Sequence, residues 1–165
     1  MVNDVTVCKI FTFDSSHQLL HHKGKCANVH GHTYKLEVQL KGQPSQETAT
    51  SDEGFVIDFS DLKRVIKKEI IDDLDHAFLA QGNEPIIEQL KSSGSKLYIL
   101  GFRTTVENLG SYICWRLKQL QLPVYSVRLW ETPTGWAEVL ASDISEEGPI
   151  FNSSQERISY EKNHI

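Results

Sequence analysis

The sequence predicts a single α+β domain in which an antiparallel four-stranded sheet carries two helices on one face. Three observations support this fold class. Four segments have the composition of strands, two longer segments repeat apolar residues at helical spacing, and their order along the 165 residues is strand, strand, helix, helix, strand, strand. We expect one domain over residues 1–165, with a core at about 5–141 and a peripheral tail at 142–165.

The first two strands are predicted at residues 5–13 and 34–41. Apolar side chains occupy every even position from Tyr34 to Leu40 and alternate with Lys, Glu and Gln. This alternation is typical of an antiparallel strand with one buried face. The polar, turn-rich stretch 42–54 is predicted to be a loop.

The first helix is predicted to begin with a cap at Asp58 or Ser60 and to end near Asp73. A second amphipathic helix begins at Thr104, because residues 104–107 have the form of a capping box that ends in Glu107. Its apolar positions recur at helical spacing. They are Val106, Leu109, Ile113, Leu117 and Leu120.

The last two strands are predicted at residues 124–131 and 135–141, joined by a turn at 132–135. Between the helices, residues 85–91 predict a short helix and residues 97–100 resemble a strand. Neither this segment nor the tail suggests a function.

Composition excludes several classes of protein. The net charge of −5 argues against nucleic-acid binding, and no apolar run is long enough to span a membrane. Three cysteines, with no secretory leader, favour a reducing, cytoplasmic location over a disulfide framework.

Histidines carry the strongest chemical signal. His30 and His32 share one face if the second strand extends back to them, and His17 lies just past the first strand, its expected neighbour. Three neutral imidazoles with an open fourth position are typical of a catalytic zinc site. The alternative is a set of surface histidines at a strand entrance.

Cys26 stands four residues before His30 and directly after Lys25. A neighbouring cation and metal favour the thiolate, which can act as a base, whereas the alternative is a buried structural cysteine.

Two carboxylates lie where they could assist chemistry. Asp75 precedes His76 and could orient it for proton transfer, or else cap the helix end. Glu131 ends a strand and could accept two hydrogen bonds from a flat N–H edge, or else remain a solvated charge.

Six motifs in order resemble the 6-pyruvoyltetrahydropterin synthase/6-carboxytetrahydropterin synthase family. They are FDSSH at 13–17, CANVHGH at 26–32, GFVIDF at 54–59, LDH at 74–76, TVEN at 105–108 and ETPT at 131–134. The three residues between Cys26 and His30 resemble the bacterial and archaeal carboxytetrahydropterin branch, which feeds synthesis of 7-deazaguanine (queuosine-type) nucleosides. The chain has Thr104 where the family usually has proline.

The resemblance implies a T-fold (tunnelling fold) whose sheets join between subunits into a barrel, and a homohexamer built as a dimer of trimers with active sites at the interfaces. It implies that zinc is bound by three histidines, that Cys26 is the base, that Asp75 and His76 relay protons, and that Glu131 anchors the pterin. Thr105, Glu107 and Lys25 are the further substrate-binding candidates. The ligands are His17, His30 and His32.

The implied reaction converts 7,8-dihydroneopterin triphosphate to 6-carboxy-5,6,7,8-tetrahydropterin, acetaldehyde and triphosphate. Two alternatives stay open: 6-pyruvoyltetrahydropterin synthase, which retains the side chain, and a non-catalytic zinc protein that binds pterins.

Overall fold

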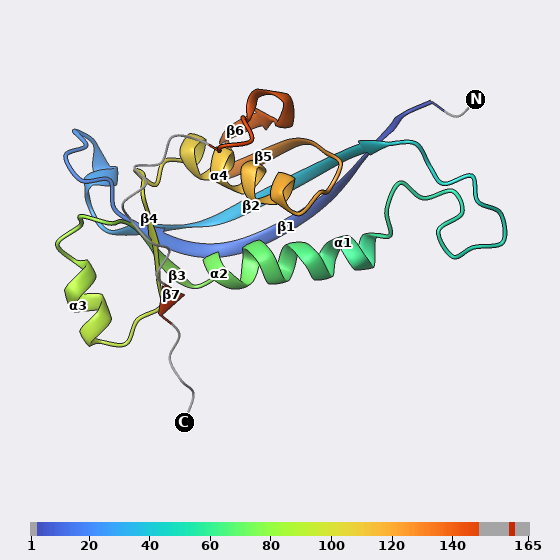
Figure 1. Cartoon of the computed structure of the whole chain (residues 1–165). Coiled ribbons are helices and arrows are strands. Elements are labelled where there is room, and N and C mark those ends of the chain that lie inside the picture. The colour runs from blue at the N-terminus through green and yellow to red at the C-terminus, as the bar shows by residue number, and fades with distance from the viewer. Residues whose placement is uncertain (1–2, 149–158, 161–165) are drawn as a thin grey trace.

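The computed structural model of the chain describes residues 3–148 and the backbone of residues 159–160. Its seven strands form one strongly curved sheet in the order β6-β5-β2-β1-β3-β4-β7 (Figure 1). The strands are β1 Val5–His17, β2 His30–Gly42, β3 Ala77–Gln81, β4 Leu97–Leu100, β5 Val124–Thr132, β6 Gly135–Leu140 and β7 Ser159–Tyr160.

The antiparallel pair β1–β2 forms the middle of the sheet and extends beyond the predicted ends of both strands. Each strand has 13 residues, and their register runs from Val5 opposite Gly42 to His17 opposite His30. The polar residues at 14–17 and 30–33 lack the apolar alternation that marked the rest of the strands, but they stay in the ladder. The extension brings the histidines of both strands together.

The prediction of a four-stranded, purely antiparallel sheet was wrong. β3 pairs parallel to β1, β4 pairs parallel to β3, and β7 adds an antiparallel strand to β4. The residues of β3 from Ala77 to Ala80 are all buried, so the strand shows no alternation between apolar and polar side chains. A short strand buried on both faces gives only a brief apolar run, which sequence periodicity cannot assign.

The first helical segment is continuous and contains an unpredicted π-turn. It comprises α1 Phe59–Ile66, the π-helix η2 Lys67–Ile71 and α2 Asp72–Leu74. The Asp58 side chain caps it as predicted by accepting hydrogen bonds from the amides of Ser60 and Asp61.

The second long helix, α4 Val106–Gln119, begins later than predicted, with its cap shifted by one residue. Thr105 rather than Thr104 is the cap, and its hydroxyl accepts a hydrogen bond from the Asn108 amide at 3.5 Å. Thr104 is buried instead, because its carbonyl and hydroxyl face His17.

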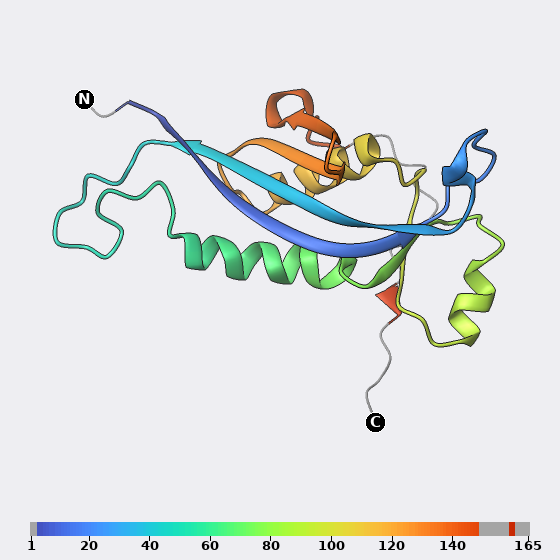
Figure 2. The ribbon, with the colours of Figure 1, turned by 180° about the vertical axis from the view of Figure 1, so that it is seen from behind.

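Both long helices pack on one face of the sheet, as predicted, around a common hydrophobic core (Figure 2). Leu62 and Ile66 from α1 and Leu109, Ile113 and Leu117 from α4 are fully buried in that core. The short helix α3 Ile87–Ser92 packs in a separate apolar cluster with residues of β3 and β4. The opposite face of the central strands carries a polar network in which Glu37 contacts Lys35, Arg128 and Trp130.

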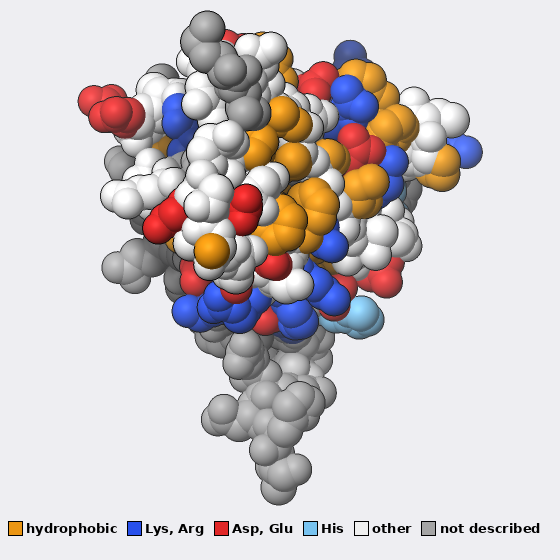
Figure 3. All heavy atoms as spheres, turned by 90° about the vertical axis from the view of Figure 1, so that its right-hand side faces the viewer, with side chains coloured by type: hydrophobic (Ala, Val, Ile, Leu, Met, Phe, Trp, Pro, Cys, Tyr) orange, Lys and Arg blue, Asp and Glu red, His pale blue; other side chains and the backbone are white. Residues whose placement is uncertain are grey.

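Hydrophobic side chains are exposed at the end of the molecule that carries the loop after β2 (Figure 3). Val5, Phe55 and Phe59 are each more than two-fifths exposed, and they line a pocket of about 340 Å³. This pocket lies at the start of β1, whereas the histidines lie at its end.

The predicted tail begins with the 3-10 turn η3 Ala141–Asp143, which α4 holds in place. Lys118 Nζ donates to the carbonyls of Ala141 and Ile144, and Trp115 donates to that of Glu146. The rest of the predicted tail, at 149–158 and 161–165, lies outside the described residues. None of the helices in the described part of the chain has the length and apolar character needed to span a bilayer.

Candidate metal centre and active site

Three histidines converge at the junction of β1 and β2. His17 and His30 are directly opposite in the register, and one ring nitrogen from each of His17, His30 and His32 lies within 4.8 Å of the other two. Gly31 lets the strands approach here, since a Cβ at this position would lie only 3.1 Å from the Ser15 carbonyl oxygen. The strand pairing therefore builds the cluster that the sequence predicted.

Backbone carbonyls fix the orientation of two of these rings. His17 Nδ1 lies 2.8 Å from the Thr104 carbonyl, and His30 Nδ1 lies 2.8 Å from the Asn28 carbonyl. Because a carbonyl only accepts, both Nδ1 atoms carry the proton and both Nε2 atoms present lone pairs. A ligand histidine is held in this way in most metal sites.

The geometry and charge of the cluster fit a zinc ion. The Nε2 atoms of His17 and His30 are 3.1 Å apart, close to the roughly 3.3 Å between ligands of tetrahedral zinc with bonds of about 2.05 Å. Two lone pairs at this distance repel unless a cation or proton lies between them. His32 Nε2 is buried and has no hydrogen-bond partner within the described part of the chain, and a metal ion would satisfy it.

Burial favours the neutral form of His17 and of His32. It lowers the pKa of His17 to about 4, against a weaker opposite effect of its bond to Thr104. Burial also lowers the pKa of His32, with His30 adding to the effect. Neutral imidazole is the form that binds metal, so the cluster is ready to accept an ion near neutral pH.

Glu131 at the end of β5 lies beside the cluster. Its Oε1 atom is 3.8 Å from Nε2 of both His17 and His32. Burial raises the pKa of Glu131, Glu107 at the start of α4 raises it further, and His30 opposes both. A half-buried carboxylate at this distance can bind a ligand seated over the histidines.

Cys26 lies in the 3-10 turn η1 Lys25–Ala27, in the loop between β1 and β2. Its carbonyl accepts a hydrogen bond from the Leu19 amide at 2.9 Å, and its thiol is half-buried. Lys25 is exposed at the start of the same turn. Burial raises the pKa of Tyr34, and Glu131 and Cys26 raise it further, so both groups lie near this phenol.

Asp75 and His76 form the predicted pair at the turn between α2 and β3. His76 Nδ1 is 3.0 Å from Asp75 Oδ1, and the His76 ring is 77% exposed. Burial alone would raise the pKa of Asp75, but hydrogen bonds from the Asp14 amide and from His76 outweigh it and lower the pKa. His76 has a φ of 57°, a left-handed conformation that costs roughly 1–2 kcal/mol for a residue with a Cβ.

His76 is not one of the three clustered histidines, but it shares a pocket with one of them. This pocket of about 380 Å³ is lined by His76, by Asp14, Ser16, Gly31 and Thr33, and also by Ser15 and His32. Asp14, Ser16, Gly31 and Thr33 alternate with the metal-ligand candidates in the β1–β2 ladder, so their positions face the opposite side of the sheet. Ser15 and His32 share the parity of the cluster and reach the pocket from its side. Glu131 contacts the cluster directly, whereas the Asp75–His76 pair meets it only where His32 enters the shared pocket.

Sequence reasoning missed several residues that support the site. Thr104 and Asn28 act through backbone carbonyls, for which no side-chain pattern exists. Arg103 Nη2 donates to the Leu20 carbonyl at 2.9 Å and so braces the loop that carries Cys26. Tyr34 shares the strand face of His32, with ring centroids 5.6 Å apart, and its buried hydroxyl has no partner among the described residues. Its parity with the two histidines could have indicated this position.

Comparisons with known proteins find relatives that match most of the chain. A 6-carboxy-5,6,7,8-tetrahydropterin synthase of Haemophilus influenzae is 47% identical over 137 residues, covering 80% of this chain and 96% of that protein. The enzyme of that name from Aquifex aeolicus is 32% identical over 69% of this chain and 75% of its own length.

The fold is also that of solved structures. The 6-pyruvoyl tetrahydropterin synthase of Caenorhabditis elegans matches with a TM-score of 0.61 and 26% identity, over 84% of this chain and 96% of that one. Residues 6–142 match the 6-pyruvoyl tetrahydropterin synthase family as a whole, as the motifs predicted, and the chain belongs to this family.

Proposed function

We propose that the chain is a 6-carboxytetrahydropterin synthase, a lyase that cleaves carbon–oxygen and carbon–carbon bonds of 7,8-dihydroneopterin triphosphate. The products are 6-carboxy-5,6,7,8-tetrahydropterin, acetaldehyde and triphosphate. The observation that carries this choice is the 47% identity to the Haemophilus influenzae enzyme over 96% of its length. We place the reaction in the cytoplasm, in the synthesis of 7-deazaguanine nucleosides.

The residues fit a zinc enzyme. His17, His30 and His32 would hold the ion, which when bound polarises the hydroxyls of the substrate's side chain. Glu131 accepts N–H hydrogen bonds from the pterin edge and fixes the ring over the cluster. Cys26 removes a proton from the side chain, and His76, held by Asp75, returns one.

Further contacts to the substrate come from the start of α4 and the Cys26 loop. Thr105 and Glu107 lie at the first turn of α4. The carbonyl of Thr104, the residue before this turn, orients His17. Lys25 is exposed beside Cys26 and offers a cation to the triphosphate.

The active site is shared between chains in this proposal. The pocket of His76 is lined largely by Asp14, Ser16, Gly31 and Thr33, which face away from the cluster. In this proposal the His76 that serves one cluster therefore comes from a second copy. β6 is the strand at one edge of the sheet, and a strand from another chain can pair with this edge. A homohexamer, as the family resemblance implies, would supply such contacts.

Product analysis tests the function. Purified protein should convert 7,8-dihydroneopterin triphosphate to 6-carboxytetrahydropterin and acetaldehyde, both identified by mass spectrometry, and a zinc chelator should abolish turnover. Retention of the carbon side chain in the product would support 6-pyruvoyltetrahydropterin synthase instead. Binding of pterin without turnover would support a non-catalytic zinc protein.

Complementation tests the shared site. We expect Cys26→Ala and His76→Ala each to be inactive alone, whereas oligomers reassembled from a mixture of both regain activity, because some sites combine an intact Cys26 with an intact His76. Absence of any recovery in oligomers shown to be mixed would place both residues in one chain's site.

A further inference from the structure

We propose that Lys96 is a positioning residue for His76, holding the turn that presents its imidazole for proton transfer. The inference rests on the role of His76 in the proposed function. It gives a task to the segment between β3 and α4, for which the sequence suggested none.

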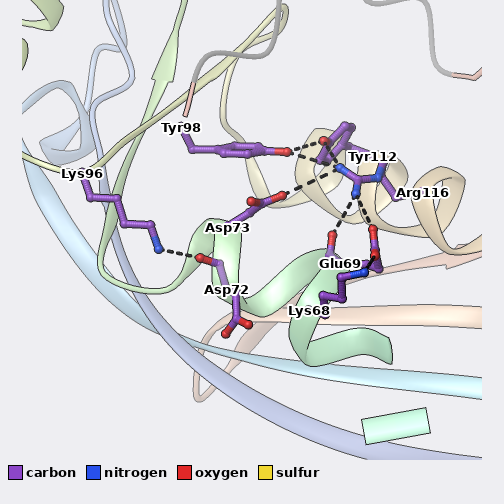
Figure 4. A network of polar contacts seen from close by, with 8 residues as sticks. All are labelled: Lys68, Glu69, Asp72, Asp73, Lys96, Tyr98, Tyr112 and Arg116. Carbon is purple, nitrogen blue, oxygen red and sulfur yellow. Dashed lines mark hydrogen bonds and ion pairs between the residues drawn. The ribbon is translucent and has the colours of Figure 1, made fainter. Parts of the chain in front are cut away.

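Lys96 caps the end of the first helical segment. Its Nζ atom donates to the carbonyl of Asp72 at 2.6 Å and to that of Asp75 at 2.7 Å (Figure 4 draws the first contact). The last carbonyls of a helix lack partners within the helix, and a cation there also opposes the helix dipole. One ammonium group thus binds the helix end and the residue directly before His76.

The turn is also tied to β1, through Asp14. The Asp14 amide donates to Asp75 Oδ1 at 3.0 Å, and its carbonyl accepts from the His76 amide at 2.6 Å. The Lys96 carbonyl accepts from the Phe78 amide at 2.9 Å, so the backbone of Lys96 lies beside the start of β3. Asp14 on β1 and Lys96 just before β4 therefore hold the turn from the two sides of β3.

The helix itself has a separate attachment, which makes the role of Lys96 testable. Arg116 on α4 donates to the Glu69 carbonyl at 2.9 Å and to the Tyr112 hydroxyl at 3.0 Å, and it lies 4.0 Å from the Asp73 carboxylate (Figure 4). These contacts remain when Lys96 is replaced. We therefore expect loss of Lys96 to loosen the turn without unfolding the helix.

The imidazole depends on this turn because little else holds it. The ring is 77% exposed, and among the described residues its polar contact is with Asp75, the neighbouring residue. A left-handed backbone at His76 is unfavourable for a residue with a Cβ unless its surroundings maintain it. Proton transfer requires the acid to lie within hydrogen-bond distance of its target.

Two variants and a control test the proposal. Lys96→Met removes the ammonium group and keeps the aliphatic stem, whereas Lys96→Arg restores a donor. Lys67→Met is the control, since Lys67 also contacts Asp72 but through the carboxylate. It removes the same charge near the turn without touching a carbonyl.

In Lys96→Met we expect faster hydrogen exchange at the His76 amide and a kcat lowered roughly ten- to a hundredfold, the scale of a misplaced catalytic group. KM and zinc content should stay at wild-type values. Lys96→Arg should recover most of the kcat, and Lys67→Met should match wild type in both measurements.

Three results would overturn the proposal: unchanged exchange at His76 in Lys96→Met, faster exchange with a wild-type kcat, or equal effects in Lys67→Met. Failure of the proposed function is seen separately, in the wild-type chain, as the absence of 6-carboxytetrahydropterin. The exchange measurement needs no substrate, so it still decides whether Lys96 holds the turn.

Discussion

Replacing His17 with asparagine should remove much of the acid sensitivity of the zinc-free protein. The His17 side chain is 1% exposed, and burial lowers its pKa from 6.5 to about 4. Between these values the unfolded chain binds a proton at His17 that the folded chain does not. The free energy of unfolding therefore falls as the pH is lowered through this window, and the contribution of His17 is fully present above pH 6.5.

The size of the effect follows from the shift. A difference from 6.5 to about 4 corresponds to about 3 kcal/mol over the whole window, at roughly 1.4 kcal/mol per pKa unit. His17→Asn removes the titrating group but keeps an N–H donor for the Thr104 carbonyl. The variant should lose this part of the pH dependence while retaining the orientation of the loop before α4.

Urea unfolding followed by tryptophan fluorescence measures the difference. The protein is stripped of metal with a chelator and studied at one fixed concentration between about pH 7 and pH 4.5. Wild type should lose about 2–3 kcal/mol more than His17→Asn over this range. His22→Asn, which removes an exposed imidazole from the adjoining loop, serves as the control. Parallel curves for wild type and His17→Asn would refute the argument that His17 is buried as a neutral ligand.

Three further substitutions separate metal binding, chemistry and recognition. His30→Ala should lose most bound zinc and all turnover while circular dichroism shows the fold retained, and full activity in a metal-free variant would contradict the metal assignment. Cys26→Ala should keep zinc and substrate binding but lower kcat roughly 10²–10⁴-fold, the range of general acid–base catalysis; weaker substrate binding at an unchanged kcat would make it a binding residue instead. Glu131→Gln should weaken pterin binding roughly ten- to a hundredfold, because it loses charge-assisted hydrogen bonds of about 1.5–3 kcal/mol each. Calorimetry measures the pterin affinity of the zinc-loaded variant. An unchanged affinity together with abolished turnover would make Glu131 part of the proton relay instead.

The histidine cluster could be predicted from the sequence because two short-range rules suffice for it. Strand alternation places His30 and His32 on one face, and antiparallel pairing of consecutive strands brings His17 opposite them. Both rules depend only on neighbours in sequence. The structure satisfies both, with His17 and His30 forming the last pair of the ladder.

The remaining features depend on contacts between distant parts of the chain. The first helical segment carries the chain to the end of β1, where β3 pairs in parallel with residues 15–17. No local pattern in residues 77–81 indicates this pairing. The shift of the α4 cap from Thr104 to Thr105 has the same origin, since the Thr104 carbonyl bonds to His17, 87 residues away in sequence. Local capping preference could not include that partner.

The division of the catalytic candidates between two faces follows from the pleat of β1 and β2. Adjacent residues of a strand point to opposite faces, so the ladder that directs His17, His30 and His32 inward must direct Asp14, Ser16, Gly31 and Thr33 outward. The outward residues line the pocket that contains His76, together with Ser15 and His32 of the inner face. The proposed function therefore takes the proton relay between Cys26 and His76 to pass between chains rather than across the sheet. If Cys26 and His76 serve one reaction, the inner face of each β1–β2 pair belongs to one active site and its outer face to another. A dissociated chain then has neither active site complete.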